Sequence, residues 1–404
     1  MSPKVIYSNQ KYSCKNCGLC CRRFRVQLTP QELKALQEHE WENVPSRFHD
    51  TIDGLHFFKR TPESRCVFLD DCNRCRIHSR LGEGAKALSC RGYPFSIVPT
   101  FPNEITVSVR LDCPAAMADD GIAVSQNASV AKIISAMHFK GNGFSERQLG
   151  YLTVPTAKEL IKQIYILSDD TTLSVVNAMN SLMLFAQHAE QLGAAFLNDT
   201  EVMAQVYPKY AENLKQELPE LLKYDLGKSE KIMFRRLMAA YCRRDEELLR
   251  IDVIARIRLA WKLCKIMVGR GNLRKIGNEH PDFQLGNVAL FSREKVELSK
   301  YAWRNYFRFL RIKLETCQFF GQAYYGADIF TGLKALFMTF PLALALAKIN
   351  AQANDRECSA EDVDYAVAAI DHSFGRNPAI GRILKLQNRL AGHFSSLVFA
   401  LCGQ

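Results

Sequence analysis

Helical periodicity dominates the chain from about residue 130 onward. Apolar residues recur there at intervals of three and four, the spacing that gives an amphipathic helix one buried face. Residues 359–362 read Ser-Ala-Glu-Asp, which places a capping hydroxyl ahead of acids in a first turn. The pattern predicts helices at 130–139, 157–167, 173–192, 201–222, 230–242, 246–268, 293–317, 332–349, 360–374 and 378–402.

The first 115 or so residues follow a different pattern. β-Branched and aromatic residues concentrate in four short stretches, which predicts strands at 23–28, 55–59, 95–99 and 105–111. Thr29-Pro30-Gln31-Glu32 predicts a helix start with a capping box, and a short helix is expected at 84–89. So little regular structure implies that cross-links replace a missing core.

Residues 118–129 (ADDGIAVSQNAS) are small and polar, and they mark the expected domain boundary. We therefore predict a mainly α protein with two parts. Residues 1–120 form a small, irregular α+β module that is rich in cysteine and stapled by metal. Residues 129–404 form a large α-helical domain with a basic surface.

The longest apolar run, residues 335–347 (ALFMTFPLALALA), is 13 residues long and contains Pro341. A membrane span needs about 20 apolar residues, so we expect a buried, kinked helix and no span. Residues 1–13 are polar and lack the apolar segment of a secretory signal. We therefore expect a cytoplasmic protein with reduced thiols.

The net charge of +11 is concentrated in residues 228–275, which hold 14 Lys/Arg against 5 Asp/Glu. Such a segment attracts acidic proteins, anionic lipids or nucleic acid, and the missing recognition motif makes nucleic acid unlikely. The default interpretation is a solvated cationic face over a packed apolar one; the alternative is a docking surface for an acidic partner. The cations are Arg250, Arg256, Arg258, Lys262 and Lys265, with Arg304, Arg308 and Arg311 further along, and the apolar residues are Leu249, Ile254, Ile257 and Trp261.

Nine of the fourteen cysteines fall between residues 14 and 113. An odd number cannot be fully paired in disulfides, and thiols in a reducing compartment stay available for metal, so metal is the preferred interpretation. Pairs at two-residue spacing bring both sulfurs to one centre, and Gly18 suits the tight turn between them. The candidate ligands are Cys14, Cys17, Cys20, Cys21, Cys66, Cys72, Cys75, Cys90 and Cys113, with His78 in a metal-like context.

The adjacent pair Cys20 and Cys21 bears on the kind of metal centre. In an extended chain neighbouring side chains point to opposite faces, so one zinc ion would not easily take both. Either two centres exist or an iron–sulfur cluster accepts both thiolates. Six nearby arginines would offset the charge of four thiolates, which favours an iron–sulfur cluster, 4Fe-4S first, over zinc. A purely structural metal is the alternative to a redox or catalytic one.

The order CKNCGLCC, Cys66-Val-Phe-Leu, Cys75-Arg-Ile-His78 and Cys90-Arg-Gly-Tyr93-Pro94 resembles the CxxCxxCC cysteine-cluster family of zinc- or iron-chelating proteins. The resemblance covers about residues 12–115. It implies that the ligands are Cys14, Cys17, Cys20, Cys21, Cys66, Cys75 and Cys90. The family includes flagellin lysine-N-methylase, so the resemblance also implies methylation of protein lysine with S-adenosylmethionine, on a flagellin-like substrate.

Two functional hypotheses follow. One is an S-adenosylmethionine-dependent lysine N-methyltransferase; neither Gly82-Glu-Gly84 nor Gly269-Arg-Gly271 follows a strand, so the cofactor would bind unconventionally, at the cluster itself. The other is a non-catalytic metal-binding or metal-handling protein that docks an acidic partner. Tyr324-Tyr325 is interpreted as core rather than as a cofactor wall. The five late cysteines (Cys242, Cys264, Cys317, Cys358 and Cys402) are expected to be buried apolar residues.

Overall fold

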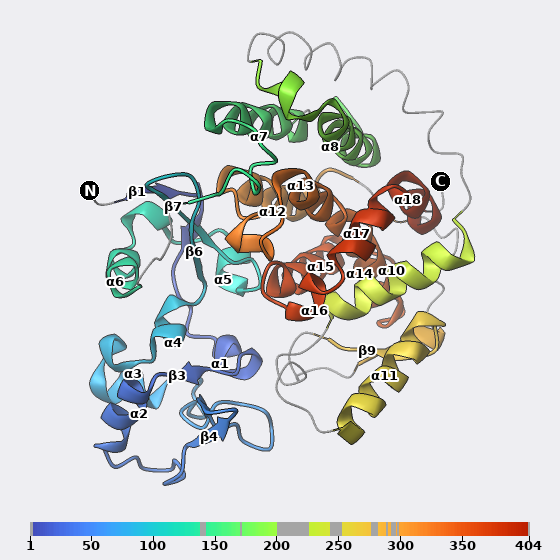
Figure 1. The fold of residues 1–404 in the computed structure, drawn as a ribbon. Coiled ribbons are helices and arrows are strands. Elements are labelled where there is room, and N and C mark those ends of the chain that lie inside the picture. The colour runs from blue at the N-terminus through green and yellow to red at the C-terminus, as the bar shows by residue number, and fades with distance from the viewer. Residues whose placement is uncertain are drawn as a thin grey trace.

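The computed structural model describes residues 3–137, 143–169, 172–199, 226–242, 253–275, 282–287, 290–291, 296 and 299–402. It is 54% helical and 11% strand, with a small N-terminal α+β region that holds many cysteines and a large helical C-terminal region. Figure 1 shows the first region at the lower left, in blue, and the helices above and to its right. The predicted fold class is confirmed.

A three-stranded sheet joins the two regions. Its order is β1 (Lys4–Tyr7), β7 (Glu104–Val109) and β6 (Phe95–Pro99), with β1 parallel and β6 antiparallel to β7. The hydroxyl of Thr106 donates to the carbonyl of Thr316 at 2.8 Å, and Ser108 donates to Gln318 Oε1 at 2.9 Å. Five of the six β7 residues are buried because the helical region covers this strand.

The rest of the N-terminal region surrounds a small core of its own. A second antiparallel sheet runs in the order β3 (Gln27–Leu28), β5 (Leu55–Phe58), β4 (His49–Ile52). Four short helices accompany it: α1 (Leu19–Arg23), α2 (Pro30–Gln37), α3 (Arg76–Leu81) and α4 (Leu88–Gly92). The buried residues of this small core are Leu28, Leu33, Leu36, Phe48, Phe58, Cys66, Val67, Phe68, Ile77 and Ala87.

Three of the four predicted strands are confirmed as β5, β6 and β7. The strand predicted at 23–28 is wrong over most of its length, because Arg23 ends α1 and only Gln27–Leu28 pairs. The helix predicted at 84–89 is replaced by the 3₁₀ turn Glu83–Ala85 followed by α4. Unpredicted short strands are β1 and β4, and the pair β2 (Lys11–Tyr12) and β8 (Ile122–Ala123).

The helical region follows residue 113. Its helices are α5 (Pro114–Met117), α6 (Ala128–Ala136), α7 (Val154–Ser168), α8 (Val175–Leu197), α10 (Lys228–Tyr241), α11 (Val253–Met267), α12 (Arg304–Glu315), α13 (Ile329–Phe337), α14 (Thr339–Gln352), α15 (Ala360–Ser373), α16 (Pro378–Gly381), α17 (Leu384–Ala391) and α18 (Phe394–Cys402). A short hairpin, β9 (Asn272–Leu273) with β10 (Phe283–Gln284), follows α11. The helices and β7 share one large main core.

Helix α14 lies at the centre of this main core. The stretch Ile329–Gln352 is long and apolar enough to cross a membrane, yet 94% of its most apolar window is buried inside the protein. The stretch breaks at Met338, between α13 and α14, just before Pro341. Proline has no N–H to donate to the preceding turn, so the break is expected there. The predicted buried, kinked helix is confirmed.

Most other predicted helices are found, with corrections at their ends. The helix predicted at 293–317 begins only at Arg304 as α12, and the one predicted at 378–402 is divided into α16, α17 and α18. Gly381 and Gly392 fall at the two breaks, where glycine weakens helix continuation. The capping box that starts α15 is present, with Ser359 and Asp362. The helix predicted at 201–222 lies outside the described residues, as do residue 139 and the start of 246–268.

The isolated cysteines and tyrosines of this region have structural surroundings. Cys242, Cys317 and Cys402 are buried as expected, but Cys358 is only half-buried and Cys264 is exposed on α11, which corrects the prediction for these two. Tyr324 is fully buried and donates to Gln387 Oε1 at 2.8 Å, while Tyr325 donates to the carbonyl of Asn377 at 2.7 Å. The tyrosine pair is therefore part of the core.

Candidate metal centre

The first cysteine turn is shaped by Gly18. Its φ of +70° lies in the left-handed region, as the spacing predicted, and it forms the N-cap of α1. A Cβ at this position would lie 3.1 Å from the Cβ of Asn73, which belongs to the loop between Cys72 and Cys75. A glycine here therefore allows the first cysteine turn and that loop to pack closely.

The neighbouring Cys20 and Cys21 lie on α1 rather than on an extended strand. Successive side chains on a helix diverge by about 100°, and the two sulfurs are 4.0 Å apart. Four thiolates bound to one zinc ion at about 2.3 Å lie about 3.8 Å from one another. The expectation that one zinc ion would not easily take both therefore loses its premise, because the chain is helical here rather than extended.

Seven of the nine predicted ligands line one cavity of about 630 Å³. This volume lies in the range of small-molecule and cofactor sites and exceeds what a single ion needs. His78, on α3, also lines it. The seven cysteines are Cys14, Cys17, Cys20, Cys21, Cys75, Cys90 and Cys113.

The two remaining candidates differ in position. Cys66 is buried behind the cavity, where its N–H donates to the carbonyl of Cys21 at 2.9 Å. Cys72 is exposed outside the cavity, and its N–H donates to Asp70 Oδ1 at 2.9 Å. The structure therefore gathers eight of the nine candidates and leaves Cys72 apart.

Four of the thiols lie around Lys86, and Cys66 lies beside these four. We call the five together the inner group: Cys20, Cys21, Cys66, Cys75 and Cys90. Burial alone would lower the pKa of Lys86, but the nearby thiols raise it overall, Cys75 and Cys90 contributing most. A cation at this point offsets part of the negative charge that metal-bound thiolates bring.

The outer group consists of Cys14, Cys17 and Cys113 and lies beside Tyr12. Burial raises the pKa of the Tyr12 hydroxyl well above its usual range, and the charges of Cys14 and Cys113 raise it further. The charge of Cys17 likewise raises the pKa of the Cys113 thiol. The charge of Cys20 also raises the pKa of Tyr12, so Cys20 lies between the inner and the outer group.

Burial keeps several of these thiols protonated in the metal-free protein. It raises the pKa of Cys66 to about 12 and that of Cys113 to about 11. Cys20 is the exception, because a hydrogen bond from Cys21 lowers its pKa to about 6 and raises that of Cys21 strongly. Metals bind the thiolate form, so binding here must displace protons.

The donor set fits a thiolate-binding metal, since sulfurs dominate it and Lys86 offsets part of their charge. Within the described part of the chain, no three His, Cys, Asp or Glu side chains converge closely enough to hold an ion. Loading a metal therefore requires rotation of cysteine side chains towards the cavity. The nine N-terminal cysteines form no disulfides that would prevent it.

Residues 13–114 match a family model described as "CxxCxxCC: Putative zinc- or iron-chelating domain". The match covers these residues alone, and we refer to residues 13–114 below as the CxxCxxCC domain. The resemblance seen in the sequence is confirmed for about a quarter of the chain, and chelation of zinc or iron is the function that goes with it. No curated protein and no solved structure matched the chain.

A buried charge network connects the CxxCxxCC domain to the helical region. Tyr93, which lines the cysteine cavity, donates to Asp112 Oδ1 at 3.3 Å. Asp112 also contacts Arg110 at 2.5 Å and His372 Nδ1 at 3.1 Å. Burial would raise the pKa of Asp112, but Arg110 and His372 hold it well below its usual range. The wall of the cavity is thus fixed to α15.

Asp371, the residue before His372 on α15, continues this network. Asp371 accepts from the N–H of Leu111 at 2.6 Å and pairs with Lys313 of α12 at 2.7 Å. Both side chains are almost inaccessible, at 1% and 4% exposure. The ion pair therefore joins α12 to α15, and the hydrogen bond from Leu111 ties both to the segment between β7 and Cys113.

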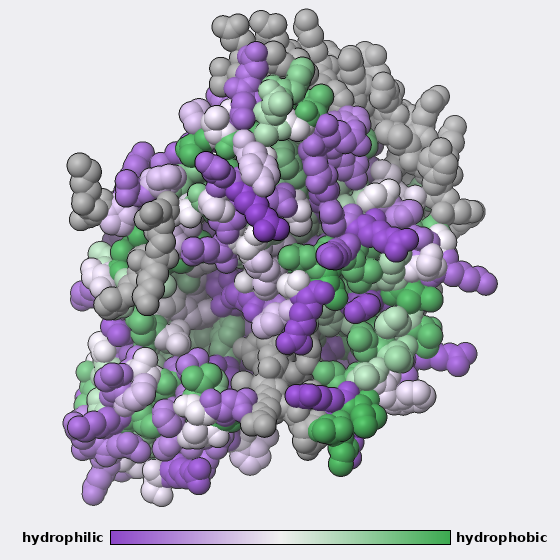
Figure 2. Space-filling view, viewed as in Figure 1, coloured by the Kyte–Doolittle hydropathy of each residue, from purple (hydrophilic) through white to green (hydrophobic). Residues whose placement is uncertain are grey.

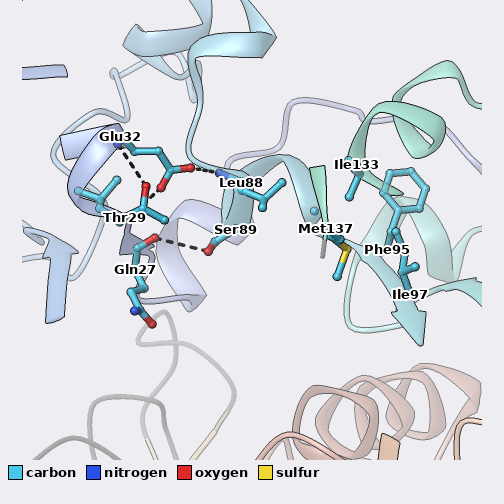
Figure 3. A pocket seen from close by; sticks show the side chains of 11 residues that line it. Gln27, Thr29, Glu32, Leu88, Ser89, Phe95, Ile97, Ile133 and Met137 are labelled. Atoms are coloured by element: carbon cyan, nitrogen blue, oxygen red, sulfur yellow. Dashed lines mark hydrogen bonds between the residues drawn. The ribbon is translucent and has the colours of Figure 1, made fainter. Parts of the chain in front are cut away.

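A second cavity of about 400 Å³ lies on the other side of α4 (Figure 3). Leu88 and Ser89 face this cavity, whereas Cys90 and Arg91 line the cysteine cavity. Figure 3 shows Glu32, the capping residue of α2, accepting from the N–H of Leu88, a bond of 2.6 Å. The predicted capping box therefore also positions the helix that carries Cys90.

The basic residues predicted as a partner surface fall into two classes. Arg308 donates to the carbonyls of Ala116 and Met117, and Arg311 pairs with Asp169, so both are engaged within the protein. Those of α11 are exposed, namely Arg256, Arg258, Lys262 and Lys265. Arg250 and Leu249 lie outside the described residues.

The default interpretation of α11 is wrong in one respect. Ile254, Ile257 and Trp261, expected to pack inside, are 62%, 64% and 64% exposed. Figure 2 shows apolar side chains in green at the lower right, where Figure 1 places α11. Helical periodicity predicts the helix but does not say which face the rest of the protein covers.

Sequence reasoning misses the residues that complete the cysteine cavity. Tyr12 and Lys86 come from segments without a recognisable motif, and only the fold brings them to the thiols. Tyr93 stands within the Cys-Arg-Gly-Tyr-Pro sequence that supports the family resemblance, but that sequence does not indicate its role. For Asp112 the one available signal is its position next to Cys113.

Proposed function

We propose that the CxxCxxCC domain holds an iron–sulfur cluster, 4Fe-4S in preference to zinc, and that the inner group of thiols supplies its ligands. The observation that carries this proposal is one cavity lined by seven cysteines and backed by Cys66. Four thiolates are the usual ligand set of such a cluster. The cavity is larger than a single ion requires, which supports a cluster, and the inner group has one thiol to spare.

The same cavity leaves room for a second component. Its volume, its tyrosines Tyr12 and Tyr93, and the outer thiols support a bound organic cofactor beside the metal. We propose S-adenosylmethionine, whose sulfonium cation is attracted to aromatic faces. The bound cluster would orient this cofactor, and the reaction would be N-methylation of lysine in a flagellin-like or otherwise acidic protein, in the reducing cytoplasm.

The first experiment identifies the metal. Anaerobic purification followed by iron, zinc and acid-labile sulfide analysis should give about four iron and four sulfide per chain. Cys20→Ser should lose the metal, whereas Cys264→Ser, a matched exposed cysteine on α11, should retain it. Zinc without sulfide would contradict the iron–sulfur cluster but would still support a metal-chelating site. A protein free of both would overturn the whole proposal.

The second experiment tests the cofactor. S-adenosylmethionine titrated into the metal-loaded full chain should bind, and Cys17→Ser or Cys20→Ser should abolish binding. If S-adenosylmethionine does not bind to the metal-loaded protein, the methyltransferase hypothesis is wrong. The competing function, a non-catalytic metal-binding or metal-handling protein, is then favoured. The exposed cations of α11 support that alternative, since they would suit an acidic protein partner.

A further inference from the structure

Helix α11 carries an exposed apolar stripe. Val253, Ile254, Ile257, Trp261 and Val268 are between 62% and 69% exposed. At about 100° per residue these side chains fall within an arc of about 100° on the helix surface. A contiguous apolar stripe of this kind is unusual on a soluble surface and marks an interaction site.

A cationic stripe runs beside the apolar one. Arg258, Lys262 and Lys265 are exposed and occupy the next sector of the helix. Residues 253–270 contain five Lys/Arg and no Asp/Glu, whereas Arg274 further along pairs with Asp282 at 2.7 Å. The Lys265 ammonium lies 5.4 Å from the ring centre of Trp261, at the border of the two stripes.

The third sector of the helix anchors it to the protein. Ile266 is buried, Leu259, Leu263 and Met267 are half-buried, and Arg235 of α10 donates to the carbonyl of Met267 at 3.3 Å. The helix is therefore attached along one side. The side chains of the apolar and cationic stripes are exposed, and α11 itself lies at the edge of the molecule in Figure 1.

The degree of exposure indicates the shape of the partner. An apolar stripe that carries tryptophan and is bordered by Lys/Arg is the pattern of helices that lie in a membrane interface, and each side chain of this stripe stands clear of the protein surface. An exposed ridge fits a planar bilayer surface. Trp261 at the edge of the stripe suits the bilayer interface, and cations beside it suit anionic headgroups.

We propose that α11 docks the protein onto an anionic phospholipid surface. The helix would lie in the plane of the interface, with Ile257 and its neighbours at the acyl boundary and Lys262 among the headgroups. This is attachment of a peripheral protein and requires no membrane-spanning segment. It is independent of the cluster and of any methyltransferase activity.

Vesicle sedimentation of the full-length, metal-loaded protein tests this. Binding is expected to phosphatidylcholine vesicles that contain phosphatidylglycerol, and not to phosphatidylcholine alone. Ile257→Ser and Lys262→Glu should each lower the partition coefficient about tenfold. The tryptophan emission should shift to the blue on binding, and Trp261→Phe should remove that shift, because Trp303 is already buried and Trp41 is packed against the small core.

Two matched variants control for general effects. Ile166→Ser removes an apolar side chain of 55% exposure on α7, and Lys132→Glu reverses an exposed charge on α6. Both should bind vesicles like the unmodified protein. The metal content of every variant should equal that of the unmodified protein, so that a folding defect is recognised.

Three results would overturn the lipid proposal. The first is no binding to anionic vesicles, or binding that Ile257→Ser leaves unchanged. The second is tight binding of an acidic amphipathic peptide with no binding to vesicles, which would make a protein the occupant. The third is a dimer in sedimentation velocity that Ile257→Ser dissociates, which would make a second copy of the chain the occupant.

Discussion

The small core and the main core of this protein differ in what stabilises them. The small core contains ten buried residues and lies beneath the cysteine cavity, with Cys21, Cys75 and Cys90 packed against it. The main core contains α14, where Phe340, Leu342 and Leu344 are completely inaccessible. Burial of apolar surface can stabilise the second region, whereas so few residues give the first only a marginal stability.

Polar contacts compensate for part of this difference. Arg60 donates to the carbonyls of Phe24 and Arg22, which ties the chain after α1 to the segment before Cys66. Side-chain hydrogen bonds of this kind contribute about 1 kcal/mol each. A structural metal in the cavity would contribute much more, because its binding free energy becomes folding free energy.

Metal removal should therefore affect the two cores unequally. Treating the loaded protein with a strong chelator should release the region around the small core to proteolysis and rapid hydrogen exchange, with protection there falling by orders of magnitude. The helices that surround α14 should keep their protection. Hydrogen exchange followed by mass spectrometry resolves both regions in one experiment.

Cys21→Ser should reproduce this pattern without a chelator, and Cys264→Ser should not. Equal loss of protection in both regions would show that the main core also depends on the metal. No loss anywhere would show that the small core is stable by itself, and the contrast between the regions would then disappear.

The junction between the regions gives the next largest effect. Asp371→Asn leaves the buried Lys313 without its counter-charge, which should cost about 3–5 kcal/mol of unfolding free energy. Burial alone would raise the pKa of Asp371, but Lys313 and Arg376 hold it below its usual range. The stabilisation of the folded protein by the ionised Asp371 carboxylate is therefore complete at neutral pH, and it is lost as the pH falls below about 4.

Urea denaturation of Asp371→Asn measures this cost, and Asp169→Asn is the matched control. Asp169 pairs with Arg311 but is 60% exposed, so its loss should change the stability by less than about 1 kcal/mol. A similar small effect for Asp371→Asn would show that the network does not join the regions energetically.

The parts of this structure that sequence predicts are those set by local pattern. The helices α7, α10, α14 and α15 follow from apolar periodicity, and the start of α2 follows from Thr29 and Glu32. The cysteine spacing likewise indicates metal-binding chemistry by itself, because the pairs lie two residues apart. Each of these signals lies within a few residues of the element that it predicts.

The parts that sequence does not predict depend on contacts between distant segments. Strand β1 is defined by its pairing with β7, about a hundred residues away, and Lys86 matters only because the fold surrounds it with thiols. The argument against one zinc ion binding both Cys20 and Cys21 assumes an extended backbone, whereas both residues lie on a helix. The exposure of Ile257 likewise depends on which face of α11 the rest of the protein covers.

The pH dependence of metal loading separates the thiols from one another and has the smallest expected effect. With a pKa of about 12, Cys66 keeps its proton at neutral pH in the metal-free protein, so its coordination releases one proton. Each released proton makes binding tenfold tighter per pH unit, or about 1.4 kcal/mol. In the hydrogen-bonded pair the ionised form of Cys20 is favoured while Cys21 keeps its proton, so the pair adds about one proton rather than two to this slope. Competition with a chromophoric zinc chelator between neutral and mildly alkaline pH should therefore show metal affinity rising with pH.

Two variants separate the thiols. Cys66→Ser should lower the slope of affinity against pH by one proton, and Cys20→Ser should weaken binding while leaving that slope nearly unchanged. An affinity independent of pH would mean that the bound metal does not draw on the buried thiols, and the small core would then have to be stabilised without them.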